Sequence, residues 1–129
     1  MSAKFTNQEI TAAIKAALAA MGEDYVYKRI PNDVSGSDGC LYAVGGQPSC
    51  IVGHVLHTLD PEMFEKVADY EENLPQYRDS GFGEVAECLD LPFDRDQVSA
   101  LCLMQVAQDG GRTWSAAARE YEEYMGERL

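Results

Sequence analysis

Apolar positions recur at helical spacing over most of the chain, and the first such stretch begins at a clear start signal. Thr6 and Glu9 stand in the positions of a capping box, in which each side chain bonds the backbone of the other residue. Apolar residues then follow three or four positions apart: Ile10, Ile14, Ala17, Leu18 and Met21. The pattern predicts a helix over about residues 7–20 that ends at Gly22.

The pattern changes between this helix and residue 49. Residues 25–30 and 40–44 are rich in aromatic and β-branched side chains, which predicts two strands. Residues 32–39 between them have the composition of an exposed loop. Strands that follow each other in sequence most simply pair as an antiparallel hairpin. A lone hairpin is marginally stable in water, so we expect helices to cover one of its faces.

The rest of the chain is predicted to be helical. Ser49 is expected to cap a helix over about residues 50–59, and Asp60-Pro61-Glu62 is a strong start for the next one. A short helix near 83–90 and two longer ones follow, with Asp94 and Thr113 as their expected caps. The predicted fold is therefore a single α+β domain over residues 1–129. In it, a small antiparallel β-hairpin packs against five or six α-helices, and the C-terminal half is all-helical.

Charge is distributed unevenly along this pattern. The chain has a net charge of −12, and residues 60–129 alone hold seventeen acidic and six basic side chains, a net charge of −11. Such a field repels phosphate backbones and disfavours direct binding of nucleic acid. It suits a solvated surface, or a surface that docks on a basic protein, as a mimic of nucleic acid would. Glu120, Glu122 and Glu123 are the candidate interface residues.

Targeting and redox signals are few. The first residues lack the apolar run of a secretory signal, and no stretch is long enough to span a membrane, so we expect a cytoplasmic protein. Four cysteines are widely spread with no CxxC pair, and reduced thiols are the default for such a chain.

The predicted helix over 50–59 has two different faces. Its aliphatic residues fall within an arc of roughly 140° and should face the core, whereas Cys50, His54 and His57 fall within roughly 60° on the opposite side. Zinc binds thiolate and imidazole ligands in tetrahedral sets, and Cys40 could supply a fourth ligand. The alternative is that Cys50 sits in a partly buried first turn while both imidazoles face solvent. No standard metal spacing is present, so the sequence assigns no cofactor.

The same helix start could bind a small anionic ligand. Gly45-Gly46 and Ser49 resemble a simple anion-binding turn before a helix N-terminus, and the tyrosines of the adjacent predicted strand could assist. The candidate ligand residues between the hairpin and this helix are Tyr27, Cys40, Ser49, Cys50, His54 and His57. No catalytic residues are assigned, because no third group orients a Cys50–His54 pair.

Several segments resemble small proteins encoded by bacteriophages of actinobacteria. The matching segments are Asp24-Tyr25-Val26-Tyr27, residues 40–44, Pro48-Ser49-Cys50-Ile51-Val52-Gly53-His54-Val55-Leu56, and Gln105 to Trp114. The resemblance spans about residues 20–118 and implies a phage origin with expression inside a bacterial host. Many such small phage proteins bind a host factor or counter a defence system.

Two functions of different classes follow from these observations. The leading hypothesis is a phage-encoded acidic accessory protein, non-enzymatic, that binds a bacterial host protein through residues 60–129, for counter-defence or as a nucleic-acid mimic. The alternative is a small-ligand protein that binds a nucleotide or metal between the hairpin and the Ser49 helix. A homo-oligomer joined through the tyrosine-bearing hairpin is a further hypothesis.

Overall fold

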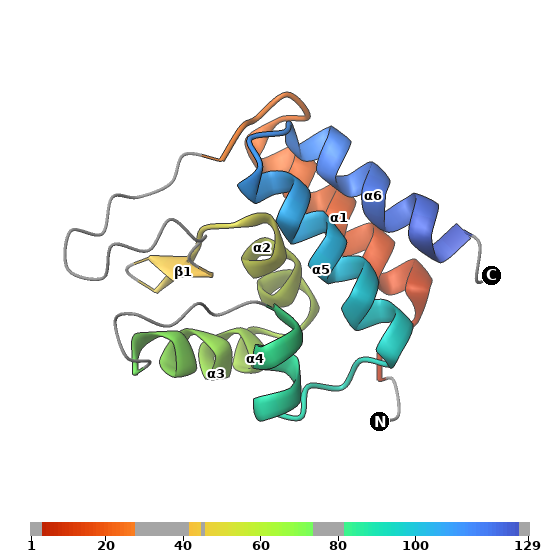
Figure 1. Ribbon diagram of the computed structural model, residues 1–129. Coiled ribbons are helices and arrows are strands. Elements are labelled where there is room, and N and C mark those ends of the chain that lie inside the picture. The colour runs from red at the N-terminus through yellow and green to blue at the C-terminus, as the bar shows by residue number, and fades with distance from the viewer. Residues whose placement is uncertain (1–3, 28–41, 45, 74–81, 127–129) are drawn as a thin grey trace.

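The computed structural model describes residues 4–27, 42–44, 46–73 and 82–126 (Figure 1). Within these ranges it contains six helices and one two-stranded antiparallel sheet, which confirms the predicted α+β class with a helical C-terminal half. In chain order the elements are α1 (Asn7–Met21), β1 (Ala43–Val44), β2 (Gln47–Pro48), α2 (Ile51–Leu59), α3 (Pro61–Glu72), α4 (Phe82–Cys88), α5 (Arg95–Asp109) and α6 (Trp114–Gly126).

Local capping explains where most of the helices begin. The capping box of Thr6 and Glu9 is present at α1, and Asp94 forms a second capping box with Gln97 at α5. Asp60 Oδ1 accepts from the backbone amides of the first turn of α3, 3.0 Å from Glu62 N. A side-chain oxygen at these positions satisfies amides that have no partner inside the helix. The predicted starts of these three helices are confirmed.

The core lies where α1, α2, α5 and α6 meet, and α2 is its central element. Helix α5 packs along α6 and also contacts α2 and α4, while α2 contacts α1 and α3 (Figure 1). Four of the five aliphatic side chains on the predicted core face of α2 are fully buried, namely Ile51, Val52, Val55 and Leu56, and the fifth, Leu59, is half-buried. Within the described ranges, no helix combines the length and the apolar character that crossing a membrane requires.

The hairpin forms between other segments than the sequence predicted. Ala43 pairs with Pro48 and Val44 with Gln47, so β1 pairs with the residues that follow it, and the described part of the first predicted strand, residues 25–27, is not paired with it. Gly46 has φ of 80°, a left-handed conformation that glycine adopts without strain and that lets the chain reverse at once. Residues 28–41, which include half of the first predicted strand and the start of the second, lie outside the described residues.

The segment after α1 instead forms hydrogen bonds with the start of α6. Val26 forms an isolated antiparallel bridge with Thr113. The Tyr25 carbonyl oxygen accepts from Trp114 N at 2.8 Å, and the Glu23 carbonyl oxygen accepts from Ser115 N at 2.9 Å. Thr113 Oγ1 accepts from the third amide of the turn, as a capping residue does. The N-terminus of α6 is thus satisfied partly by residues about ninety positions earlier in the chain.

Candidate functional site

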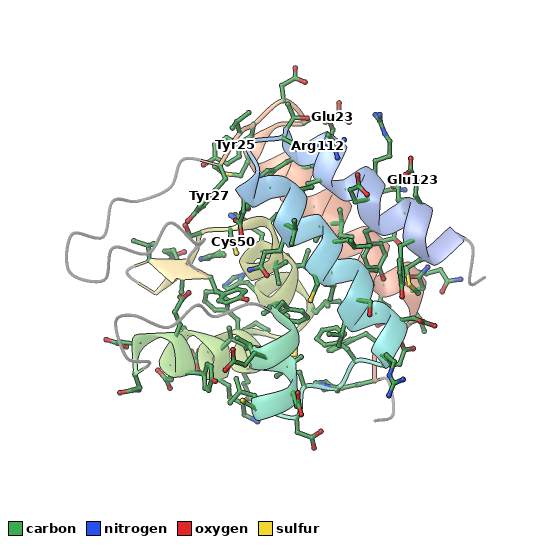
Figure 2. The ribbon with its side chains drawn as sticks, in the orientation of Figure 1. Glu23, Tyr25, Tyr27, Cys50, Arg112 and Glu123 are labelled. Atoms are coloured by element: carbon green, nitrogen blue, oxygen red, sulfur yellow. The ribbon has the colours of Figure 1, made fainter. Side chains whose placement is uncertain are left out.

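The start of α2 differs from the prediction in its capping residue. Ser49 was expected to cap the helix, but the N-cap is Cys50, whose Sγ accepts from Gly53 N at 3.4 Å. The Ser49 hydroxyl lies 3.0 Å from the Tyr27 hydroxyl and bonds that side chain instead. Figure 2 shows Tyr27 and Cys50 near the start of α2, and both are buried. The Cys50 thiol therefore lies in the core rather than on an open face.

The two imidazoles of α2 meet different aromatic neighbours. The His54 ring is half-buried and edge-on to Trp114, with 5.3 Å between the ring centroids. The His57 ring is exposed and edge-on to Phe64, with 5.1 Å between the centroids. Burial, and secondarily the charge of His57, lowers the pKa of His54 below its usual value, which favours the neutral ring. The helical row that the sequence predicts is thus divided among three environments.

This arrangement bears on the metal hypothesis. Among the described residues, no group of three or more His, Cys, Asp or Glu side chains is placed to hold a metal ion. Cys50 Sγ is engaged with Gly53 N, and His57 is directed at Phe64. Cys40, the fourth candidate ligand, lies outside the described residues.

The hairpin is fixed to the helices by Tyr42, a residue to which the sequence analysis assigned no role. Its ring is fully buried, and its hydroxyl accepts from Gln105 Nε2 at 3.0 Å. Its backbone N–H donates to both carboxylate oxygens of Glu71, at 3.1 and 3.0 Å. Its carbonyl oxygen accepts from Ser49 N at 3.0 Å. Tyr42 therefore joins β1 to α3, α5 and the residue before the N-cap of α2.

Gly53 makes this docking possible. A Cβ built on Gly53 would lie 3.1 Å from the carbonyl carbon of Tyr42 and 3.2 Å from its Cα, and it would overlap the carbonyl oxygen. The close approach that a glycine inside a helix suggests is confirmed, and the approaching group is the backbone at the start of the hairpin.

Glu71 is the acidic member of this junction. Its carboxylate also accepts from Ala43 N, 3.3 Å from Oε1. Burial raises the pKa of Glu71 to about 7, although its bonds to the Tyr42 and Ala43 amides act to lower it. No sequence signal indicates this role, because Glu71 lies beside Glu72 and resembles a solvated residue.

Replacing Glu71 should change how stability depends on pH. The pKa in the folded protein is above the ordinary value of 4.5, so the folded state holds a proton that the unfolded state has lost. The contribution of Glu71 is therefore full below about pH 4.5 and is lost as the pH rises towards 7. We expect the stability of the wild type relative to Glu71→Gln to fall between pH 5 and pH 8, measured by urea denaturation. Glu72→Gln, at the exposed neighbour, should keep the wild-type slope, and parallel curves for wild type and Glu71→Gln would contradict the assignment.

Three buried glutamines on α5 hold other elements in place. Gln97 Nε2 donates to the Phe5 carbonyl at 2.9 Å, and Gln105 Oε1 accepts from Phe82 N, the first amide of α4, at 3.1 Å. Gln108 Oε1 accepts from Ile51 N, the first amide of α2, at 2.8 Å. Two helix starts are thus capped by side chains distant in sequence. The sequence analysis assigned no role to these three glutamines, because the groups that they bind lie far away in the sequence or on the backbone.

The side chain of Trp114 carries a buried donor. Within the described part of the chain, its indole Nε1 has no hydrogen-bond partner, although the residue is fully buried. The rings of His54 and Tyr25 both meet it edge-on, and the Tyr25 centroid lies 4.9 Å away. A buried donor without an acceptor is uncommon in folded proteins.

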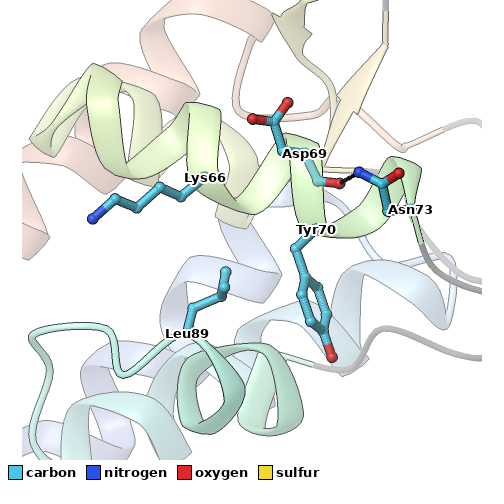
Figure 3. Close-up of a pocket in the computed structure, with 5 residues that line it drawn as sticks. All are labelled: Lys66, Asp69, Tyr70, Asn73 and Leu89. Atoms are coloured by element: carbon cyan, nitrogen blue, oxygen red, sulfur yellow. Dashed lines mark hydrogen bonds between the residues drawn. The ribbon is translucent and has the colours of Figure 1, made fainter.

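A hollow of about 490 Å³ lies between α3 and the end of α4 (Figure 3). It is lined by Lys66, Asp69, Tyr70, Asn73 and Leu89. Asn73 Nδ2 donates to the Asp69 carbonyl at 2.8 Å, which closes the C-terminal turn of α3. None of these residues was among the sequence candidates, and the side chains of Lys66 and Asp69 are exposed.

The candidate interface residues of α6 differ from one another. Glu120 Oε1 accepts from Arg112 Nη1 at 2.6 Å, so Glu120 is engaged within the chain. Glu122 and Glu123 are exposed, and Figure 2 shows Glu123 on the outer side of α6. The structure therefore leaves two of the three predicted interface residues exposed.

Comparisons of the chain with protein-family models, with curated proteins and with solved structures found no match.

Proposed function

We propose that this protein is a phage-encoded acidic accessory protein that binds a basic surface of a bacterial host protein and catalyses no reaction. The observation that carries the proposal is the concentration of exposed carboxylates in the second half of the chain. Residues 60–129 have a net charge of −11, and exposed glutamates on three helices contribute to it. The exposed ones are Glu62, Glu65 and Glu72 on α3, Glu84 and Glu87 on α4, and Glu122 and Glu123 on α6.

A field of this kind attracts cationic surfaces and speeds their encounter, and added salt weakens it. The arrangement of carboxylates on several helices also suits a nucleic-acid mimic, because a partner that binds phosphates would meet similar charge. Counter-defence is the biological role that the resemblance to actinobacteriophage proteins suggests.

Capture of a partner from an actinobacterial lysate tests the proposal. Immobilised wild-type protein should enrich a partner at about 0.05 M salt and lose it at about 0.5 M, since screening shortens the range of charge interactions. The double variant Glu122→Gln/Glu123→Gln should weaken capture. The matched control is Glu23→Gln/Asp24→Asn, which removes two exposed carboxylates from the other half. Glu120 is left unchanged because its replacement would break the pair with Arg112. No enriched partner, or equal loss in both variants, would count against the proposal.

A second candidate function is the binding of a small polar ligand beside α2. It is favoured by the buried Trp114 Nε1–H, a donor that would gain an acceptor, next to the half-buried ring of His54. Thermal-shift measurements with a panel of nucleotides and with Zn²⁺ test it. A stabilising shift that His54→Gln removes would support this function, and the absence of any shift would exclude the ligands used.

A further inference from the structure

Helix α5 has apolar side chains on its outer side as well as on its core side. Val106 is 67% exposed and Leu103 is 41% exposed, whereas Leu101 and Met104 are fully buried. Leu103 and Val106 are three positions apart, and half-buried Ser99 lies one turn before Leu103, so the three share one side of the helix. We call Ser99, Leu103 and Val106 the outer stripe.

The rest of the chain leaves much of the apolar surface of the outer stripe uncovered. Val106 has the largest exposed fraction among the exposed large apolar residues of the described chain. An exposed valine within a helix is less favourable than alanine by about half a kcal/mol, because its branched side chain loses rotamer freedom. Folding alone therefore gives no reason for valine at this position, whereas a surface that becomes covered does.

Acidic helices border the outer stripe on both sides. On one side lies α4, whose Gly83 approaches α5 so closely that an added Cβ would be 3.6 Å from Cys102 Sγ. On the other side lies α6, where the Tyr124 hydroxyl donates to Asp96 Oδ1 at 3.5 Å. Figure 1 shows α5 in front with α6 beside it and α4 below its middle. Both neighbours carry exposed carboxylates, among them Glu87 on α4 and Glu123 on α6.

We propose that the outer stripe of α5 is the docking surface for an amphipathic, basic helix of the partner protein. This inference rests on the proposed function and names the surface and the kind of segment that it binds. Leu103 and Val106 form a short ridge that fits the groove between side chains of another helix. Apolar residues of the partner would cover them, and Lys or Arg on both sides of that apolar face would meet the carboxylates of α4 and α6.

Charge complementarity decides the occupant. A second copy of this chain would bring another net charge of −12 against the same acidic borders, which disfavours self-association. A nucleic acid would meet the same repulsion. Helix α5 has fifteen residues and is about 22 Å long, so a facing helix of about four turns would cover it.

The experiment uses the full chain and two labelled synthetic peptides of eighteen residues. The first carries leucine at helical spacing with lysine elsewhere, and the second has the same composition in scrambled order. We expect the patterned peptide to bind the wild type about tenfold more tightly than the scrambled one, measured by fluorescence anisotropy, because only it can bury an apolar face. Leu103→Ser and Val106→Ser should each remove most of this difference.

The control variant is Met21→Ser, because Met21 is 39% exposed, close to the 41% of Leu103, but lies at the end of α1. We expect its affinity for the patterned peptide to stay within twofold of wild type. Amide chemical-shift changes in the wild type should be largest for α5, α4 and α6, which tests the surface without any variant. Circular dichroism checks that each variant is folded.

The outcomes separate this inference from the proposed function. Equal binding of both peptides, or equal effects of Val106→Ser and Met21→Ser, would overturn the docking surface while leaving a charge-driven partner in place. Dimerisation in light scattering that Val106→Ser abolishes would also overturn it, with a second copy as the occupant. If the lysate capture fails but the patterned peptide binds tightly and its binding depends on the outer stripe, the proposal of a host partner is contradicted. The docking surface is then still supported.

Discussion

Replacing Gly53 with alanine should lower the free energy of unfolding by about 3 kcal/mol, because the added methyl group has no room. It would overlap the carbonyl oxygen of Tyr42, a backbone atom whose residue is fixed at its N–H, its hydroxyl and its carbonyl. Alanine favours a helix over glycine by about 1 kcal/mol, which offsets only part of this cost. Urea denaturation followed by the fluorescence of Trp114, the single tryptophan, measures the change.

Gly83→Ala is the matched control for this prediction. Gly83 also lies in a helix, and a Cβ there would meet Cys102 Sγ at 3.6 Å, an ordinary contact distance. We expect Gly83→Ala to leave stability unchanged or to raise it by up to about 1 kcal/mol. If Gly53→Ala were as stable as Gly83→Ala, the hairpin would not be held against α2 as described.

Replacing Gln105 with leucine should cost about 3 kcal/mol, although leucine has a similar size and is more apolar. The change removes the acceptor of Phe82 N, a buried amide at the start of α4, and the donor to the Tyr42 hydroxyl. Each buried polar group that loses its partner costs about 1–3 kcal/mol, which exceeds the gain from burying a more apolar side chain. The same urea measurement gives the value.

A double-mutant cycle separates the two bonds of Gln105. Adding Tyr42→Phe to Gln105→Leu removes the hydroxyl that has lost its donor, so the double variant should be more stable than the sum of the single effects predicts. Gln8→Leu, at an exposed position of α1, is the control for the exchange of glutamine for leucine and should have little effect. Strict additivity would show that Gln105 and Tyr42 do not interact.

Helix positions were predictable because their signals are local. The caps at Thr6, Asp60 and Asp94 lie within three residues of the amides that they bind, so sequence spacing contains the necessary information. The pairing of β1 was not predictable in this way. Strand β1 pairs with the residues just after it, while Val26 of the first predicted strand meets Thr113, far along the chain, and sequence spacing does not indicate such a distant partner.

The candidate site at α2 was predicted in its periodicity but not in its surroundings. Apart from half-buried Leu59, the aliphatic face is buried as expected. The opposite side, however, is only partly exposed to solvent. The backbone of Tyr42 covers Gly53, Trp114 packs on His54, and Cys50 is buried as the N-cap. A helical wheel gives directions around one helix and carries no information on which distant segments pack there, so the burial of Cys50 could not be predicted from it.

The carbonyls of Glu23 and Tyr25, which close the first turn of α6, have a consequence for synthesis on the ribosome. The amides that they accept from belong to Trp114 and Ser115, so these bonds form only after about ninety further residues have been made. Contacts between such distant positions carry a large loop-closure cost and slow folding. The turn after α1 must therefore wait for α6, and a nascent chain that lacks α6 would leave this turn without its anchor.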